Sequence, residues 1–222
     1  MLKSILYKEW IKIRMIVIIV LGLSLLALIN MFLKVRHDVL FVDAVNYWYS
    51  FLFRGFTFFG ILKFLPFAAG LGVAVAQYFP ETVNKRIKLT FHLPLSENGV
   101  LLKMHAFGAV VLLMLFMVIY LFFIIGSSIF FPSDIIVPSL LTLSPWFLGG
   151  MVTYFLVALV LLEPVWVYRG LYTVIAAGFV TIFFMSAPIA GYSQTLLLLA
   201  VLTLLLSCVV LFSGYRFRKG EM

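Results

Sequence analysis

Charged residues are scarce in this chain of 222 residues: they make up 11% of it, whereas hydrophobic residues make up 65%. A soluble domain has about 25% charged and about 45–50% apolar residues. A surface of this composition cannot face water, so we expect lipid to be the solvent of this chain. The disordered and collagen-like classes are excluded by the same composition.

Cysteine and catalytic motifs are also nearly absent. The single Cys208 lies in an apolar run, so no disulfide can form within the chain. The sequence has no GxxxxGK[ST] phosphate loop, no HExxH motif and no cluster of Cys and His at metal spacing. An intramembrane protease would need a buried serine–histidine pair, which the predicted spans do not offer. We therefore expect no enzyme activity, no metal site and no cofactor in this chain.

Long apolar runs, by contrast, are abundant. A spanning helix needs about 20 mostly apolar residues, and six runs meet this requirement. They are residues 15–33, 56–79, 104–131, 139–162, 171–189 and 195–213. The predicted fold class is therefore an all-α membrane protein, with one transmembrane domain of six helices over residues 1–222. Its expected location is the cell membrane, which it crosses several times.

Basic residues are distributed unevenly around these runs. Of the 16 lysines and arginines, 12 lie before the first run, after the last, or in the loops that follow the second and fourth runs. The positive-inside rule then places both termini in the cytoplasm. The net charge of +8 is explained by these loops and by anionic lipid, so we expect no nucleic-acid partner.

Residues 1–14 are predicted to form an amphipathic helix at the membrane interface. Ile5 and Ile13 lie on its apolar face, and at 100° per residue Glu9 falls between them. A carboxylate there is costly unless a cation meets it. We expect that cation to come from the loop 80–103, as Arg86 or Lys88. The alternative is that Glu9 reaches past the apolar face to water.

The loop 80–103 combines charged and apolar residues, as a docking surface does. Pro94 blocks helix continuation and holds Leu93 in an extended conformation. Ser96 can then cap a new turn that leads into the third run. The expected result is a short helical elbow in the cytoplasm. The residues expected to form its docking surface are Glu81, Thr82, Asn84, Lys85, Arg86, Ile87, Leu89, Phe91, Leu93 and Pro94.

The interiors of the predicted spans carry no stripe of charges. Ion-coupled transporters usually place charges at mid-membrane, so the pattern favours an apolar or amphipathic cargo. Asn30, Thr57 and Lys63 are the candidate contacts along a substrate path, although Lys63 can also snorkel to the outer face. Near the inner end of the fourth run, Glu163 and Arg169 predict a local ion pair.

The order of these features resembles the membrane subunit of bacterial type-2 ATP-binding-cassette (ABC) exporters. In that family a Lys-Glu pair lies in an N-terminal connecting helix, which corresponds here to Lys8-Glu9. The first cytoplasmic loop of the family begins with Glu and ends in a Leu-Pro-hydrophobic-Ser/Thr stretch followed by Lys. The corresponding residues here are Glu81, Arg86, Leu93-Pro94-Leu95-Ser96 and Lys103.

The resemblance implies a complex. Two membrane subunits, either two copies of this chain or one copy and a related permease, would associate with two separate ATPase subunits that bind ATP and Mg. Residues 82–92 would be the coupling helix, seated in a groove of the ATPase. Lys8 and Glu9 would brace the connecting helix against this loop. Closure of the ATPase dimer would then tilt the spans and open a path outward.

Two other functions stay open at the level of the sequence. A stand-alone small-solute carrier or a vitamin-capture membrane subunit would need no docking elbow and would bind a small molecule by itself. A membrane assembly scaffold would hold a structural partner without ATPase activity.

Overall fold

The computed structural model describes residues 2–83 and 97–212, and this part of the chain is helical, without strands. The elements are α1 (Leu2–Val42), α2 (Ala44–Arg54), η1 (Gly60–Lys63), α3 (Phe64–Thr82), α5 (Glu97–Phe130), α6 (Ser133–Leu162), α7 (Trp166–Phe184) and α8 (Leu196–Ser207). The helical part of the predicted fold class is therefore confirmed for the described residues.

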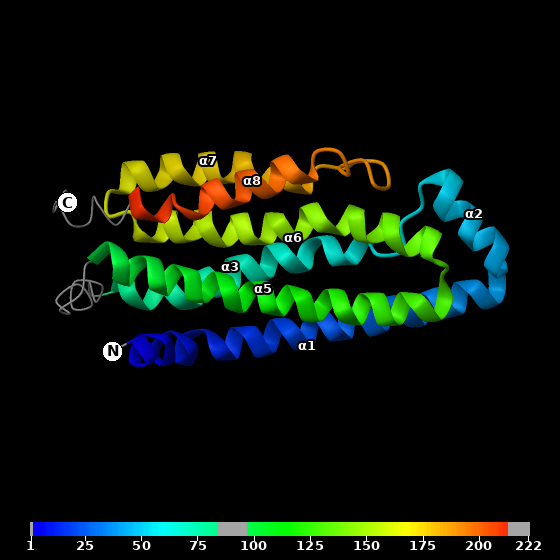
Figure 1. Cartoon of the computed structure of the whole chain (residues 1–222), viewed down its shortest axis with the longest axis horizontal. Helices are drawn as coiled ribbons and strands as arrows, with labels where there is room; N and C mark the ends of the chain where they lie inside the picture. Colours follow the sequence, from blue (N-terminus) through cyan, green and yellow to red (C-terminus); the bar gives the residue numbers. More distant parts are fainter. Residues whose placement is uncertain (1, 84–96, 213–222) are drawn as a thin grey trace.

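The long helices run side by side along one axis (Figure 1). Helix α6 holds the bundle together, because it packs against α3, α5, α7 and α8. Helix α1 packs on α3 and α5, while the short helix α2 lies at the far end of the bundle. The start of α1 and the end of α8 lie at the same end, which we call the inner end (Figure 1).

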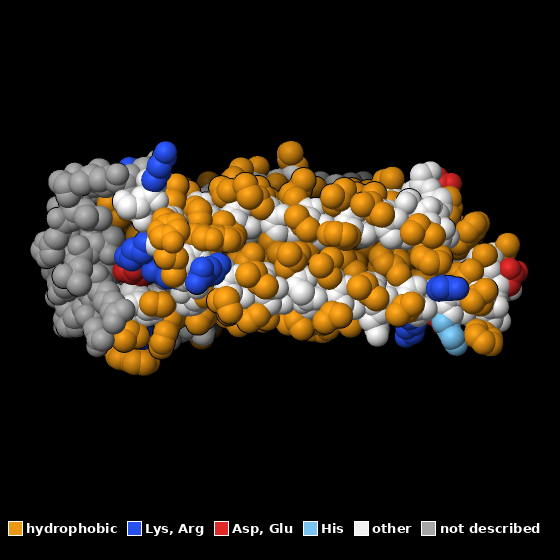
Figure 2. Space-filling view, turned by 90° about the horizontal axis from the view of Figure 1, so that it is seen from below, with side chains coloured by type: hydrophobic (Ala, Val, Ile, Leu, Met, Phe, Trp, Pro, Cys, Tyr) orange, Lys and Arg blue, Asp and Glu red, His pale blue; other side chains and the backbone are white. Residues whose placement is uncertain are grey.

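Five of the described helices are long and apolar enough to cross a membrane. Figure 2 shows hydrophobic side chains over the middle of the visible face, with basic side chains near its two ends. The sixth predicted span, 195–213, corresponds to the apolar helical stretch Leu196–Phe212, which begins with α8. This stretch rises about 25 Å, which is short of the ~30 Å hydrocarbon core of a bilayer.

Helix α1 has no break at residue 14, where the sequence analysis separated an interfacial helix from the first span. Its 41 residues form one continuous helix that rises about 60 Å. Nothing in this stretch stops a helix, because it contains no proline and its one glycine, Gly22, is tolerated. The helix ends at Asp43, where φ is 75°.

The second span and the following loop also differ from their predicted bounds. Residues 56–59 are not helical, because the chain leaves α2 through Gly55 in the left-handed conformation, with φ of 67°. Helix α3 continues to Thr82, and α5 already begins at Glu97. Both ends of the predicted loop 80–103 therefore belong to helices.

The fifth span ends earlier than predicted. Helix α7 stops at Phe184, whereas the predicted span ran to residue 189. Pro188 explains the difference, since proline disfavours the helical conformation of the residue before it and cannot donate a helical hydrogen bond. The backbone N–H of Ala190 instead donates to Thr142 Oγ1 of α6, at 2.8 Å.

Helix α6 contains two prolines and stays helical. Pro138 and Pro145 each leave a backbone carbonyl without its usual N–H donor. Hydroxyl groups donate to backbone carbonyls in the same stretch: Thr142 Oγ1 to Pro138 O and Ser144 Oγ to Leu140 O, both at 2.8 Å. Neither accepting carbonyl is one that the prolines free, since those belong to Asp134 and Leu141.

Helices α3 and α6 approach each other closely at two glycines. A Cβ atom added to Gly70 would collide with the carbonyl oxygen of Gly150, and one added to Gly150 would lie 2.5 Å from the carbonyl oxygen of Pro66. Small residues at such crossings let backbones pack directly, which is how helices associate in lipid.

Gly70→Ala is expected to destabilise the fold by about 1–3 kcal/mol, because its methyl group would strike backbone that cannot move without shifting α6. Gly178→Ala on α7 is the matched control, since a Cβ there meets nothing within 4 Å. Thermal unfolding of the detergent-solubilised protein measures both. Equal Tm values for the two variants would contradict this packing account.

Candidate functional site

Four charged side chains meet at the inner end, where α1 begins and α3 ends. Lys12 Nζ lies 2.6 Å from Glu9 Oε1 and 2.6 Å from Glu81 Oε1. Lys8 Nζ lies 2.7 Å from the same oxygen of Glu81. Both glutamates are buried, whereas the Lys8 side chain is 46% exposed. We call Lys8, Glu9, Lys12 and Glu81 the ion cluster.

The spacing of residues along α1 brings its three members together. Lys8 and Lys12 are four residues apart, and Glu9 precedes Lys12 by three, so all three lie on adjoining parts of one helix face. Glu81 is 69 residues further along the chain than Lys12. It joins them because α1 packs against α3.

The ion cluster balances two negative charges with two positive ones. Taking a carboxylate out of water costs several kcal/mol, and a cation at hydrogen-bond distance offsets that cost. Lys12 is the central member, because its ammonium group contacts both Glu9 and Glu81. Lys8 contributes less, since its half-exposed ammonium group is screened by water.

Glu9 lies on the buried face of α1, as its position in the sequence predicted, and it meets a cation. That cation is Lys12 of the same helix. The two expected partners, Arg86 and Lys88, lie outside the described residues. The alternative that Glu9 reaches water is wrong, because the residue is fully buried.

Two of the predicted docking residues are described, and both belong to the last turn of α3 rather than to a loop. Glu81 is only 2% exposed and pairs with Lys8 and Lys12 of α1, and its docking role stays a prediction. The hydroxyl group of Thr82 donates to the carbonyl of Phe79, at 2.9 Å. The other predicted docking residues lie outside the described ranges: Asn84, Lys85, Arg86, Ile87, Leu89, Phe91, Leu93 and Pro94.

A second polar network lies beside the ion cluster and joins α3, α5 and α6. The Tyr154 hydroxyl donates to Gln77 Oε1 at 2.7 Å, and Gln77 Nε2 donates to the backbone carbonyl of Met104 at 2.7 Å. Tyr78 Oη lies 2.8 Å from His105 Nδ1. All five residues are buried. We call Gln77, Tyr78, Met104, His105 and Tyr154 the inner polar network.

Gly108 makes room for the inner polar network. A Cβ atom at this position would collide with Gln77 Oε1 and with the hydroxyl oxygen of Tyr154. Sequence analysis did not identify this network. The available signal was a few polar side chains inside otherwise apolar runs, but a pattern along one helix does not say which helices face each other.

The three candidate path residues lie on different elements. Asn30 is exposed on α1, Thr57 is exposed in the segment after α2, and Lys63 is partly buried at the end of η1. Across the ranges 2–83 and 97–212, no hydrogen bond or ion pair joins them to each other. Their role as substrate contacts therefore stays a prediction.

Arg169 binds backbone carbonyls at the end of α6, and among the described residues its expected ion pair with the Glu163 carboxylate is not found. Its Nη2 donates to the backbone carbonyl of Glu163, at 2.7 Å. Its guanidinium carbon lies 4.8 Å from the centre of the Trp166 ring. A cation is favourable here, because the last carbonyls of a helix lack partners and carry partial negative charge.

No group of three or more His, Cys, Asp or Glu side chains that could hold a metal ion is found in the part of the chain that the structure describes. Comparisons with family models, with curated proteins and with solved structures gave no match. The exporter family of the sequence analysis is therefore a proposal that rests on this chain's own residues.

Lys12→Met is expected to destabilise the protein by about 3–5 kcal/mol, because two buried carboxylates lose their shared cation. The triple variant Glu9→Gln, Lys12→Met, Glu81→Gln removes all three charges and is expected to regain most of that loss. Lys3→Met, at an exposed position of α1, is the control. Equilibrium unfolding in mixed micelles measures the differences; a triple variant as unstable as Lys12→Met would refute this electrostatic explanation.

Tyr154→Phe is expected to cost about 1–3 kcal/mol, since Gln77 Oε1 would lose the hydroxyl donor that satisfies it in a buried site. Tyr7→Phe removes the same hydroxyl group from an exposed ring of α1 and is expected to be neutral. The Tm of each variant is compared in the same detergent. If Tyr154→Phe matched Tyr7→Phe, the inner polar network would not stabilise the bundle.

Proposed function

We propose that this chain is the membrane-spanning permease subunit of an ATP-driven ABC exporter. It would cross the bacterial inner membrane several times, with both termini in the cytoplasm, and pair with a second copy or a related permease. Separate ATPase subunits would bind ATP and Mg, and this chain would carry no catalytic group. The observation that carries the proposal is the ion cluster at the base of the loop 80–103.

The ion cluster is placed to transmit force from the loop 80–103 to helices α1 and α3. Glu81 lies two residues before the end of the first described range, so the loop starts from a residue that Lys8 and Lys12 hold. A push on the loop would therefore move α3 and α1 together instead of bending one helix end. Packed helices respond to such a push by shifting as rigid elements.

The inner polar network extends this connection. Gln77 and Tyr78 lie one turn before Glu81 on α3, and they bind Met104, His105 and Tyr154 on α5 and α6. Four helices would thus respond to movement of one loop. This arrangement supports a coupling role for the inner end, with docking contacts in the loop itself.

The distribution of charge supports an apolar or amphipathic cargo. The buried carboxylates of the described residues are Glu9, Glu81 and Glu163, and all three lie near helix ends at the inner end. A path for ions or protons would require such groups deeper in the spans. Export, rather than import, follows from the resemblance.

The two alternatives have weaker support. A stand-alone carrier or vitamin-capture subunit would hold its solute in a cavity, and the pocket between α5, α6 and α8 of the described residues has a volume of about 260 Å³. Sites for drug-sized ligands measure about 300–1,000 Å³. A scaffold would not need a braced loop.

Co-purification from native membranes in mild detergent, followed by mass analysis and an ATPase assay, tests the proposal. We expect an ATPase of about one domain, roughly 100–250 residues, to accompany the chain. Arg86→Glu combined with Leu93→Glu should release it, because both changes alter the predicted docking surface. Lys3→Glu is the matched charge reversal outside the loop and should retain the ATPase.

The triple variant Glu9→Gln, Lys12→Met, Glu81→Gln separates docking from coupling. It should keep the ATPase bound but lose transport, since the predicted docking residues from Asn84 to Pro94 would be unchanged and the charge pairing of Glu81 with α1 removed. Recovery of the chain alone, without nucleotide hydrolysis, would overturn the exporter proposal. Tight binding of a small molecule to the isolated chain would then favour a carrier.

A further inference from the structure

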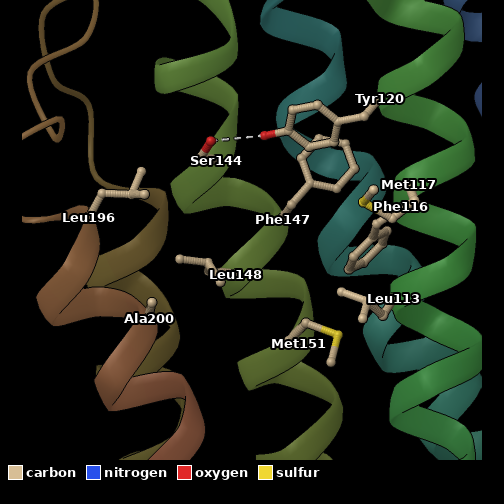
Figure 3. A pocket seen from close by; sticks show the side chains of 10 residues that line it. All are labelled: Leu113, Phe116, Met117, Tyr120, Ser144, Phe147, Leu148, Met151, Leu196 and Ala200. Carbon is tan, nitrogen blue, oxygen red and sulfur yellow. Dashed lines mark hydrogen bonds between the residues drawn. The ribbon is translucent and has the colours of Figure 1, made fainter.

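A pocket of about 260 Å³ lies between helices of the bundle, and no residue of the ion cluster lines it (Figure 3). Helix α6 runs between α5 and α8, and side chains of all three helices line the pocket. Most of its walls are hydrocarbon or thioether, from residues such as Leu113, Met117, Leu148, Met151 and Ala200.

The two polar side chains of the pocket are already paired. The Tyr120 hydroxyl donates to Ser144 Oγ at 3.1 Å, as Figure 3 shows, and Ser144 Oγ donates to the carbonyl of Leu140 at 2.8 Å. Both hydroxyl hydrogens therefore point to protein oxygens. A water molecule needs about 2–4 polar partners, so the pocket favours hydrocarbon over water or a polar head group.

Along α5 the pocket lies well inside the helix, whereas on α8 it begins at the first residue, Leu196. Leu113 is 16 residues from the start of α5, which places it about 24 Å along the helix. Met117 is 65% exposed, so the pocket opens sideways to the surroundings of the bundle. In a bilayer these surroundings are acyl chains, and the volume suits part of one chain rather than a whole lipid.

We propose that this pocket holds one acyl chain of a bilayer phospholipid, whose head group lies outside it. The proposal rests on the membrane location given above, but not on an ATPase partner. Because lipid tails are as apolar as leucine, binding comes from close packing rather than from the hydrophobic effect. Met117 and Met151 suit this role, since unbranched thioether side chains adapt to irregular shapes.

Photolabelling of the full-length protein in phosphatidylcholine vesicles tests the proposal. The probe is phosphatidylcholine with a diazirine at the middle of one acyl chain, and mass spectrometry maps the adducts. We expect adducts to concentrate on Met117, Leu148 and Met151. The reference is Val174 of α7, which is 72% exposed and lies outside the pocket.

Ala200→Phe should abolish the pocket adducts, because the ring would fill the space that the chain occupies. Leu197→Phe, on the same helix at an exposed position outside the pocket, is the matched control and should leave them unchanged. Leu196→Phe narrows the pocket at another position and should reduce the same adducts, which keeps the test valid if Ala200→Phe does not fold.

Equal labelling of the pocket and of Val174 would overturn the proposal, as would pocket adducts that persist in both filling variants. Absence of adducts from every predicted span would overturn it together with the membrane location. A chain that purifies without an ATPase but keeps its pocket adducts would contradict only the exporter proposal.

Discussion

Lys12 holds two buried carboxylates at hydrogen-bond distance, one from its own helix and one from α3. The rest of the inner end depends on this contact. It sets where α3 lies along α1, and α3 in turn carries Gln77 into reach of Tyr154 on α6. Removing one partner of a buried ion pair is strongly destabilising, because it leaves an uncompensated buried charge.

This arrangement places the buried carboxylates of the described residues at the inner end and leaves the middle of the bundle without them. The exporter proposal agrees with that division, since coupling needs a braced loop base, whereas an apolar cargo needs no charged path. The lateral pocket belongs to the apolar part. Its hydroxyl groups, Tyr120 and Ser144, are paired with the protein, so the two proposals concern different surfaces and different chemistry.

Several helix ends differ from the ends of the predicted spans, because a run of apolar residues reports hydropathy but not where the backbone stops being helical. Helix α1 continues past residue 14 because hydropathy changes there while helix propensity does not. Helix α7 stops at Phe184 because Pro188 follows, although the residues between them are mostly apolar. Pro145 has no such effect in α6, which is packed on several sides. A hydropathy pattern locates spans, and local backbone chemistry with tertiary packing sets their ends.

The sequence by itself determined the helical class, because lipid leaves backbone groups no partner outside a helix, and it placed Glu9 on a buried face through the 100° turn per residue. It also located the end of α6 at Leu162. Only the tertiary structure decided that Lys12 is the partner of Glu9, that Glu81 points inward, and that Tyr154 meets Gln77. The physical reason is that periodicity describes one helix at a time, whereas these contacts depend on which helices are neighbours and on their relative height.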